Sequence, residues 1–233
     1  MRSSIEGIAF DLDGTLYPNY RLNIRLIPFI LKEWRLLAAF GEARVIIRKE
    51  QKNGAPPRGD FYNYQAELTA KLMSKKPDFV KEKIDRLMYK GWEELFKKIK
   101  LFKGAAETLD TFKKAGLKLG LLSDFPPEKK LENLGLLNSK EGAVWDAVLC
   151  SEHCGAIKPH PQSFTTLASL MGLPCEKILY VGNSHSYDII GANGAGMKTA
   201  LIRSPLILGS GCKKPKPDFS FHSYRQLRRF MVN

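Results

Sequence analysis

Two aspartates separated by one residue follow an apolar run close to the start of the chain. The segment Ile5–Pro18 reads IEGIAFDLDGTLYP, and its apolar part ends at Asp11, with Asp13 two positions later. Such a run predicts a strand buried in a parallel sheet, with its carboxyl end where open α/β sheets bind ligands. Two carboxylates there predict a site for a hard cation such as Mg²⁺, which helps to bind phosphate. The alternative is a solvated turn, because Asp, Gly and Thr are common turn formers.

Polar side chains also follow the other strands that the apolar pattern predicts. They are Ser123 and Asp124 after residues 117–122, Lys158 in a Lys-Pro-His-Pro loop after 147–149, and Asn183 and Asp188 after 178–181. Taken singly, a turn serine or a solvated lysine would explain each position. Together they repeat the arrangement of the first segment, because each polar group stands where an apolar strand ends.

These segments resemble, in chain order, the four motifs of the haloacid dehalogenase-like superfamily of hydrolases. Asp11-Leu12-Asp13-Gly14-Thr15 looks like the first motif, Ser123 matches the second and Lys158 the third. Gly182-Asn183 with Asp188 resembles the fourth. The resemblance covers nearly the whole chain. It implies an α/β fold with a Rossmann-like three-layer core and a parallel sheet.

The resemblance also implies a phosphatase that works through an aspartyl-phosphate. Asp11 would be the nucleophile, and Asp13 would donate and later accept a proton. Lys158 would offset negative charge and, with Ser123, bind the phosphoryl oxygens. Asp124 belongs to the same phosphate-binding set by position, or it organises the loop.

The implied cofactor is Mg²⁺, held by Asp11, by the backbone carbonyl of Asp13 and by Asn183 and Asp188. Asn183 departs from the family pattern, which usually has a carboxylate there. An amide oxygen still coordinates a hard cation, although with less charge, so weaker metal binding is expected.

The elements that position these groups are expected to form two units. Residues 16–101 lack strand-like runs and show helical spacing over about 26–49, 60–73 and 77–98, with a break expected near Gly41. Residues 1–15 and 102–233 alternate between helix and strand patterns and are expected to form the core, which ends in a helix from about Tyr224. By resemblance, 16–101 would be a helical cap that closes over the site and selects the substrate.

The length and net charge of the chain limit the kinds of partner that we expect it to bind. The chain has 233 residues, 44% of them hydrophobic, and a net charge of +13, so it can bury a core and attract anions. Residues 16–101 carry 19 Lys and Arg against 10 Asp and Glu. This balance would steer a small phosphorylated substrate towards an acidic pocket. Nucleic acid binding through Phe61, Tyr62 and Tyr64 is a less favoured alternative, because aromatic residues at this spacing more often pack between helices.

The segment Leu26–Phe40 is the most apolar part of the expected cap. Its apolar residues recur at helical spacing: Ile27, Ile30, Leu31, Trp34, Leu37 and Ala38. We expect this face to pack against another helix, and an interfacial membrane helix is the alternative. No apolar run approaches the roughly 20 residues that a membrane span requires.

The cysteines and the N-terminal residues predict a reduced, cytoplasmic protein. Cys150, Cys154, Cys175 and Cys212 lack the paired spacing of a disulfide framework, and nothing like a signal peptide precedes the first strand. Zinc binding at Cys150, His153 and Cys154 is not favoured, because no second ligand pair follows at zinc-finger spacing.

Two other functions compete with the phosphatase. A sugar phosphomutase of this family would use a histidine near the start of the cap, but all four histidines lie after residue 152. A non-catalytic protein on the same core, recognising nucleic acid or an anionic surface, would account for Asn183 and for the basic cap. Asp13 argues for a phosphate ester over a halide substrate, since a halide leaving group needs no proton. The substrate itself and the oligomeric state do not follow from these residues.

Overall fold

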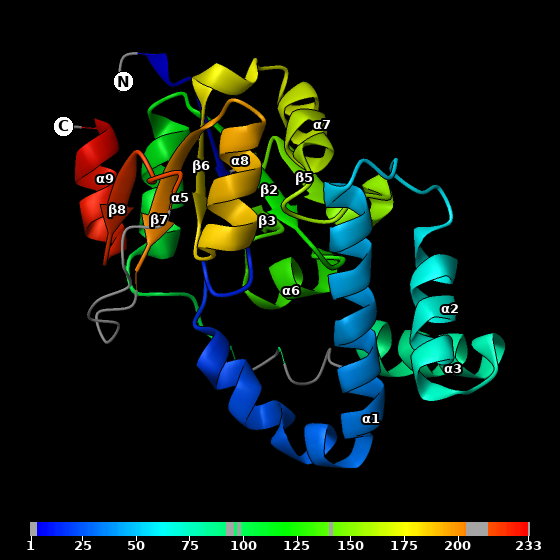
Figure 1. The fold of residues 1–233 in the computed structure, drawn as a ribbon. Coiled ribbons are helices and arrows are strands. Elements are labelled where there is room, and N and C mark those ends of the chain that lie inside the picture. Colours follow the sequence, from blue (N-terminus) through cyan, green and yellow to red (C-terminus); the bar gives the residue numbers. More distant parts are fainter. Residues whose placement is uncertain (1–3, 92–95, 97–98, 140–141, 204–213, 233) are drawn as a thin grey trace.

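The computed structural model of the chain describes residues 4–91, 96, 99–139, 142–203 and 214–232. A parallel sheet with helices on both faces forms the core, and a helical region, within residues 19–90, extends from it (Figure 1). The expected α/β fold with a Rossmann-like core is confirmed.

The sheet has the strand order β5-β2-β1-β6-β7-β8, and every neighbouring pair is parallel. The strands are β1 (Gly7–Phe10), β2 (Lys118–Ser123), β5 (Ala147–Cys150), β6 (Ile178–Gly182), β7 (Lys198–Ile202) and β8 (Phe219–Phe221). β1 lies centrally, between β2 and β6, and all four of its residues are buried. The polar residues that follow β1, β2, β5 and β6 therefore meet at one edge of the sheet.

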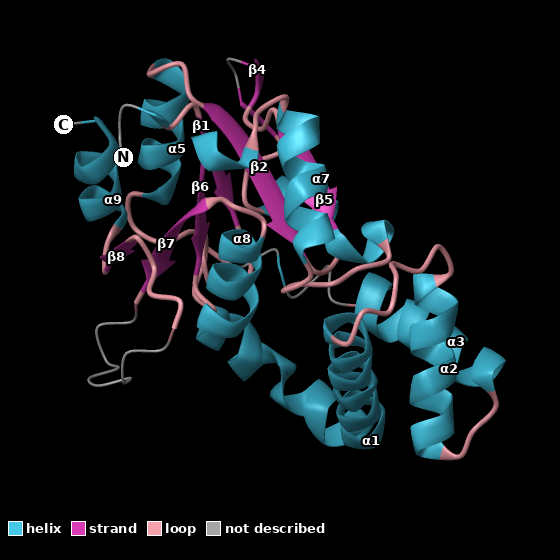
Figure 2. Ribbon diagram, turned by 45° about the horizontal axis from the view of Figure 1, so that its top comes forward, coloured by secondary structure: helices cyan, strands magenta, loops and turns pink. Residues whose placement is uncertain are grey.

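Alternate residues of the strands pack against two layers of helices, which Figure 2 shows on either side of the sheet. On one face Ile8, Phe10 and Leu121 join a cluster with α5 (Ala105–Lys114) and α9 (Tyr224–Val232). On the other, Ala9 and Tyr180 pack with α7 (Pro161–Met171), beside which lies α8 (Ile190–Gly194). The period of two along the strands produces this division.

Shorter elements complete the core. They are α6 (Glu128–Asn133), the strands β3 (Asn138–Ser139) and β4 (Gly142–Ala143), the 3₁₀ turns η3 (Ser151–Cys154) and η4 (Cys175–Lys177), and the π-helical turn η5 (His185–Ile189). The predicted strands agree with these bounds to within about two residues. The strand β8 was not expected from the sequence.

The helical region consists of α1 (Asn19–Lys52), α2 (Phe61–Met73), α3 (Pro77–Ile84) and the π-helical turn η2 (Asp85–Lys90). The part of the expected third helix that falls on residues 92–95 and 97–98 lies outside the described residues. The region has its own apolar cluster, in which Leu36 and Phe40 of α1 pack against Ala66, Ala70 and Val80.

Helix α1 bends once. The expected break near Gly41 is wrong, because the backbone leaves helical geometry at Glu33, where φ is −118° and ψ is 24°. Pro28 lies one turn and a half before the bend and cannot donate a backbone hydrogen bond. Within the described residues, none of the helices combines the length and apolar character required to cross a bilayer.

Candidate active site

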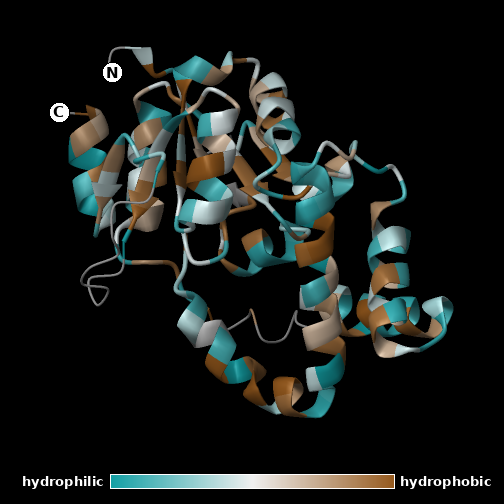
Figure 3. Ribbon diagram, viewed as in Figure 1, coloured by the Kyte–Doolittle hydropathy of each residue, from teal (hydrophilic) through white to brown (hydrophobic). Residues whose placement is uncertain are grey.

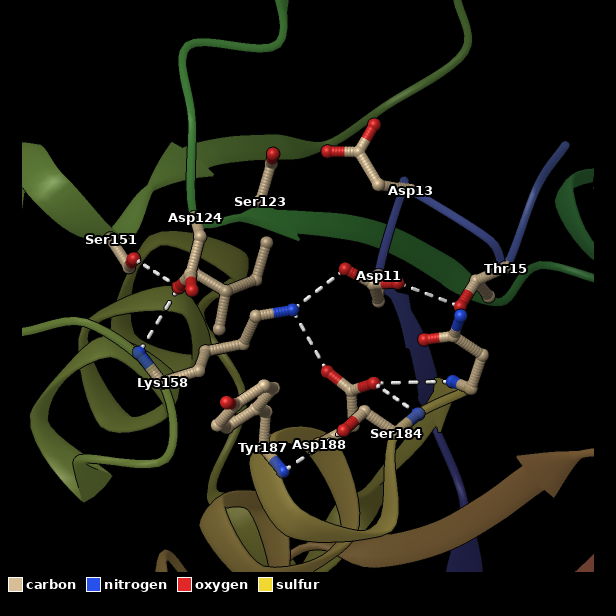
Figure 4. Close-up of polar contacts among 12 residues, drawn as sticks. Asp11, Asp13, Thr15, Ser123, Asp124, Ser151, Lys158, Ser184, Tyr187 and Asp188 are labelled. Carbon is tan, nitrogen blue, oxygen red and sulfur yellow. Dashed lines mark hydrogen bonds and ion pairs between the residues drawn. The ribbon is translucent and has the colours of Figure 1, made fainter. Parts of the chain in front are cut away.

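Asp11 lies at the carboxyl end of β1 and is buried. Its backbone N–H donates to Val181 O at 2.9 Å, which continues the pairing of β1 with β6. One carboxylate oxygen, Oδ2, accepts a hydrogen bond from Thr15 Oγ1 at 2.7 Å. The other, Oδ1, lies 2.7 Å from Lys158 Nζ. The carboxylate is thus held from both sides (Figure 4).

Lys158 joins Asp11 to a second buried carboxylate, Asp188. Its Nζ lies 2.8 Å from Asp188 Oδ1. The other oxygen of Asp188 accepts the backbone N–H groups of Asn183 and Ser184, at 3.1 and 2.9 Å. Three motif side chains from three different strand ends therefore form one contiguous network (Figure 4).

The network of Asp11, Asp188 and Lys158 contains two carboxylates and only one ammonium group. Burial raises the pKa of Asp11 to about 7, and the neighbouring charges of Asp188 and Asp13 act in the same direction, against the attraction of Lys158. Burial alone would lower the pKa of Lys158, but Asp11 and Asp188 raise it well above its usual value. The lysine therefore stays charged, and the pocket holds more negative charge than one ammonium can offset.

Ser123 and Asp124 end β2 beside this network and have different surroundings. Ser123 is buried, and its Oγ accepts the backbone N–H of Phe125 at 3.2 Å, so the hydroxyl proton is available to a phosphoryl oxygen. Both carboxylate oxygens of Asp124 already accept hydrogen bonds from other groups of the protein. Its Oδ1 accepts Ser151 Oγ at 2.6 Å and the backbone N–H of Lys158 at 3.1 Å. The Asp124 side chain thus positions the loop of Lys158, and its negative charge disfavours contact with phosphate.

Two arginines of α1 complete the surroundings of Asp124. Arg48 donates through Nη2 to Asp124 Oδ2 at 2.8 Å and through Nε to the carbonyl of Lys158 at 2.8 Å. Arg44 Nη2 lies 3.3 Å from the same Asp124 oxygen, and its Nη1 pairs with buried Glu152. Burial would raise the pKa of Asp124, but the charges of Arg44, Lys158 and Arg48 outweigh it and lower the pKa to about 2. These contacts connect the helical region to the loop that carries Lys158.

Asp13 lies on the other side of Asp11. Its side chain points away from the network of Lys158 and Asp188 in Figure 4. Both its oxygens lie 2.7 Å from Lys130 Nζ of α6, and Tyr17 donates its hydroxyl to Oδ1. Burial and the charges of Asp13 and Asp11 raise the pKa of Tyr17, so this phenol remains a donor. Asp13 is accordingly fixed in orientation while 28% of its side chain stays exposed, which a group that exchanges protons requires.

A pocket opens beside Lys130, between the helical region and the loop after β2. It is lined by Met88, Tyr89, Phe96, Phe125, Pro126, Lys129 and Lys130. Apolar rings make up most of this lining, and the two lysines supply positive charge. One of the lining residues, Lys130, also contacts the carboxylate of Asp13.

The oxygen donors near Asp11 fit a magnesium ion. Among the described residues, no three His, Cys, Asp or Glu side chains are grouped for metal binding, so a site here depends on two carboxylates, Asp11 and Asp188, with the Asn183 amide and the Asp13 carbonyl. All are hard oxygens, and Mg²⁺ typically keeps several waters when it is bound by one or two carboxylates. Burial is the main cause of the raised pKa of Asp11, and the charges of Asp188 and Asp13, which add to it, are ones that a divalent cation would offset.

Gly14 allows the first and fourth motifs to approach each other. Its φ is +87°, and a Cβ at this position would lie 2.1 Å from Asn183 Nδ2 and 2.7 Å from Asn19 Nδ2. Asn19 Nδ2 also donates to the Asp13 carbonyl at 3.2 Å, while its Oδ1 is buried without a hydrogen-bond partner. Only glycine combines this backbone conformation with such close contacts.

The structure thus brings together Asp11, Asp188 and Lys158, with Ser123 and Asn183 at their margin. Five residues that contact the site were not among the predicted site residues: Tyr17, Asn19, Lys130, Arg44 and Arg48. Lys130 and the arginines carried no local signal, since each is one basic residue among many on an expected helix. Tyr17 and Asn19 lie close enough to Asp13 in the chain to have been candidates.

The family model for "haloacid dehalogenase-like hydrolase" matches residues 5–196 of the chain. A phosphoglycolate phosphatase from Salmonella paratyphi A is 28% identical to it over 96% of this chain and 91% of the relative. Pyrophosphatase PpaX from Bacillus cereus is 33% identical over 48% of this chain and 51% of the relative.

Solved structures share the fold. The crystal structure of a HAD phosphatase from Thermococcus onnurineus matches with a TM-score of 0.63 and 22% identity, covering 98% of each chain. At this level of identity the likeness establishes the arrangement of elements and leaves the chemistry to the side chains described above.

Proposed function

The chain belongs to the haloacid dehalogenase-like hydrolase family, and from this premise we propose that it is a Mg²⁺-dependent phosphomonoesterase acting on a small phosphorylated metabolite. Relatives named as phosphatases support the reaction class. The observation that carries the proposal is the buried network in which Lys158 joins Asp11 to Asp188 at the carboxyl edge of the sheet.

In the proposed reaction a carboxylate oxygen of Asp11 attacks the phosphorus atom of the ester. A bond forms from Asp11 to phosphorus while the bond to the leaving oxygen breaks, and Asp13 donates a proton to that oxygen. Asp13 then accepts a proton from the water that hydrolyses the aspartyl-phosphate. Phosphate is released, and both aspartates return to their starting states.

Other side chains stabilise the transferring group. The hydroxyl of Ser123 and the ammonium of Lys158 are available to its equatorial oxygens, whose charge must be stabilised in the transition state. Tyr17 and Lys130 keep the Asp13 carboxylate turned towards the leaving group. Asp124, held by Arg48, keeps the Lys158 loop in place.

Mg²⁺ would be held by Asp11, the Asp13 carbonyl, Asp188 and Asn183. When bound, it supplies Lewis acidity and reduces the repulsion between the nucleophile and the phosphate. Oδ2 of Asp188 accepts two backbone N–H groups, so Asp188 would contribute Oδ1, the oxygen that also pairs with Lys158.

We assign residues 16–101 as a cap and residues 1–15 and 102–233 as the catalytic core. The contacts of Arg44 and Arg48 with Asp124, Glu152 and Lys158 support this division, since they join α1 to the loops after β2 and β5. The pocket beside Lys130 then lies between cap and core, where the leaving group of the substrate would be bound.

Turnover of p-nitrophenyl phosphate tests the proposal. We expect activity that requires Mg²⁺, is lost on chelation and falls by about 10⁴-fold or more in Asp11→Asn, which lacks the nucleophile. Beryllium fluoride with Mg²⁺ should form an adduct on Asp11 in the wild-type protein. Absence of turnover, or turnover that survives in Asp11→Asn, would contradict the proposed mechanism and favour a binding protein on this core.

A further inference from the structure

The N-terminal half of α1 exposes a stripe of large apolar side chains. Ile24, Ile27 and Leu31 recur at intervals of three and four residues and therefore lie on one face of the helix, and Trp34 follows directly after the bend at Glu33. Their side chains are 49–72% exposed. We call these four residues the apolar stripe. The expectation that the apolar face of residues 26–40 packs against another helix is wrong for Ile27, Leu31 and Trp34, and also for Ile30, which is 41% exposed.

The second half of the same helix has the expected packing. Leu36, Phe40, Ala43 and Ile47 follow the same three and four spacing and are all buried. The N-terminal half of α1, in contrast, runs away from the core as far as the bend (Figure 3), and the four side chains of the apolar stripe are exposed. Large exposed apolar side chains grouped on a short segment are a feature of docking sites, because contact with water disfavours them.

The charges beside the stripe have one sign. Between Asn19 and Arg35 the chain carries four basic residues and one acidic residue, Glu33. Glu33 is already paired with Lys83, with 2.6 Å between the charged atoms. Lys32 and Arg35 are exposed, and the Arg35 guanidinium lies over the Trp34 ring at 5.3 Å. An apolar face with a tryptophan, bordered by basic residues, is typical of helices that lie in a membrane interface.

The same charges disfavour a second copy of this chain as the partner. A symmetric dimer through the stripe would bring identical patches together, so Lys32 and Arg35 would face basic residues of the other copy. The bend at Glu33 and the proline at position 28 also make this segment unsuitable for a long, regular pair of helices.

We propose that the segment from Ile24 to Arg35 docks on an anionic lipid surface. The apolar stripe inserts at the level of the headgroups, and the flanking Arg25, Lys32 and Arg35 contact anionic lipid phosphates or carboxylates. The inference is independent of the proposed hydrolysis, because the segment lies outside the residues placed in the active site.

Vesicle flotation with the full chain tests this inference. Vesicles of phosphatidylcholine with about 30% phosphatidylserine should bind the protein, and pure phosphatidylcholine vesicles should bind it at least roughly tenfold more weakly. Raising the salt concentration from about 50 to about 500 mM should weaken the binding further, since it screens the attraction between the basic residues and the lipid.

Substitutions separate the apolar from the electrostatic contribution. Ile24→Gln with Leu31→Gln should reduce binding about tenfold or more, because both side chains lose their apolar contact with lipid. Arg25→Gln with Lys32→Gln should reduce it by roughly fivefold for each charge. Matched controls are Phe79→Gln, an equally exposed apolar residue on α3, and Lys75→Gln with Lys76→Gln, two exposed lysines outside the segment.

Turnover of p-nitrophenyl phosphate shows that each variant is folded and should stay at the wild-type level. Failure of the wild-type protein to float, or an equal loss in the control variants, would overturn the inference. So would a dimer in sedimentation that Leu31→Gln dissociates, since the stripe would then be occupied by a second copy. A loss of turnover in the wild-type protein would bear on the proposed reaction and leave the lipid result intact.

Discussion

The two aspartates of the first motif are each paired with a lysine, and the two pairs differ in burial. In the pair of Asp11 and Lys158 the side chains are 7% and 5% exposed, and a second carboxylate, Asp188, shares the lysine. In the pair of Asp13 and Lys130 the values are 28% and 9%. The first we call the inner pair and the second the outer pair.

This difference fits the two roles that we propose. A nucleophile gains from a dry, charged site whose groups are held in place before the reaction. A proton donor needs access to the leaving group and to water, so partial exposure serves it better. The inner pair should therefore be coupled to the stability of the fold, and the outer pair mainly to the rate.

Removal of the inner lysine should have the largest effect. Lys158→Gln leaves Asp11 and Asp188 buried without their cation, and we expect the free energy of unfolding to fall by about 3 kcal/mol or more. Turnover should fall by roughly a thousandfold. Urea unfolding in the presence and absence of Mg²⁺ checks this, because the ion should restore part of the stability if both carboxylates bind it.

Lys177→Gln is the matched control for an exposed ion pair, since Lys177 lies 2.6 Å from Glu6 at the surface. We expect at most about 0.5 kcal/mol there. A similar loss of stability in the two variants would show that burial of the inner pair has no special consequence.

Loss of the outer carboxylate should affect the rate and leave the fold intact. In Asp13→Asn we expect kcat/KM for an alkyl phosphate to fall by roughly a hundredfold to a thousandfold. The fall for p-nitrophenyl phosphate should be smaller, because nitrophenolate leaves without a proton. Equal losses for both substrates would contradict the role of Asp13 as the proton donor.

The free energy of unfolding as a function of pH measures how much Asp124, which positions the Lys158 loop, contributes to stability. Its pKa is lowered to about 2 by Arg44, Lys158 and Arg48, against the effect of burial. A lowered pKa stabilises the fold above the unfolded value near 4, and this contribution is lost as pH falls through about 2. It amounts to about 2 kcal/mol. The difference in unfolding free energy between wild type and Asp124→Asn should therefore shrink between about pH 5 and pH 2. A constant difference would contradict this account.

Removal of the outer lysine should have the smallest effect. In Lys130→Gln, Tyr17 still holds Asp13, so we expect kcat/KM to fall by about tenfold or less. The free energy of unfolding should change by at most about 1 kcal/mol, because the pair is partly exposed. Lys114→Gln, which removes an exposed lysine paired with Asp110 on α5, is the control and should match the wild type. A loss as large as that of Lys158→Gln would remove the distinction between the two pairs.

The position of the site could be predicted from the sequence. Asp11, Ser123, Lys158 and Asp188 each follow an apolar strand, and parallel strands bring their carboxyl ends to one edge of a sheet. The family resemblance in these segments is confirmed by the match over residues 5–196. The roles of the individual side chains remain predictions.

The contacts of the helices with distant residues could not be predicted from the sequence and became clear only in the three-dimensional structure. Lys130 meets Asp13 across 117 positions of the chain, and Arg44 meets Glu152 across 108. The apolar stripe is the opposite case. The helical spacing of its residues indicated a buried face, but the structure leaves these side chains exposed. Helical periodicity reveals that one face is apolar. What covers that face depends on how separate elements are placed in space, and no local pattern of residues contains this information.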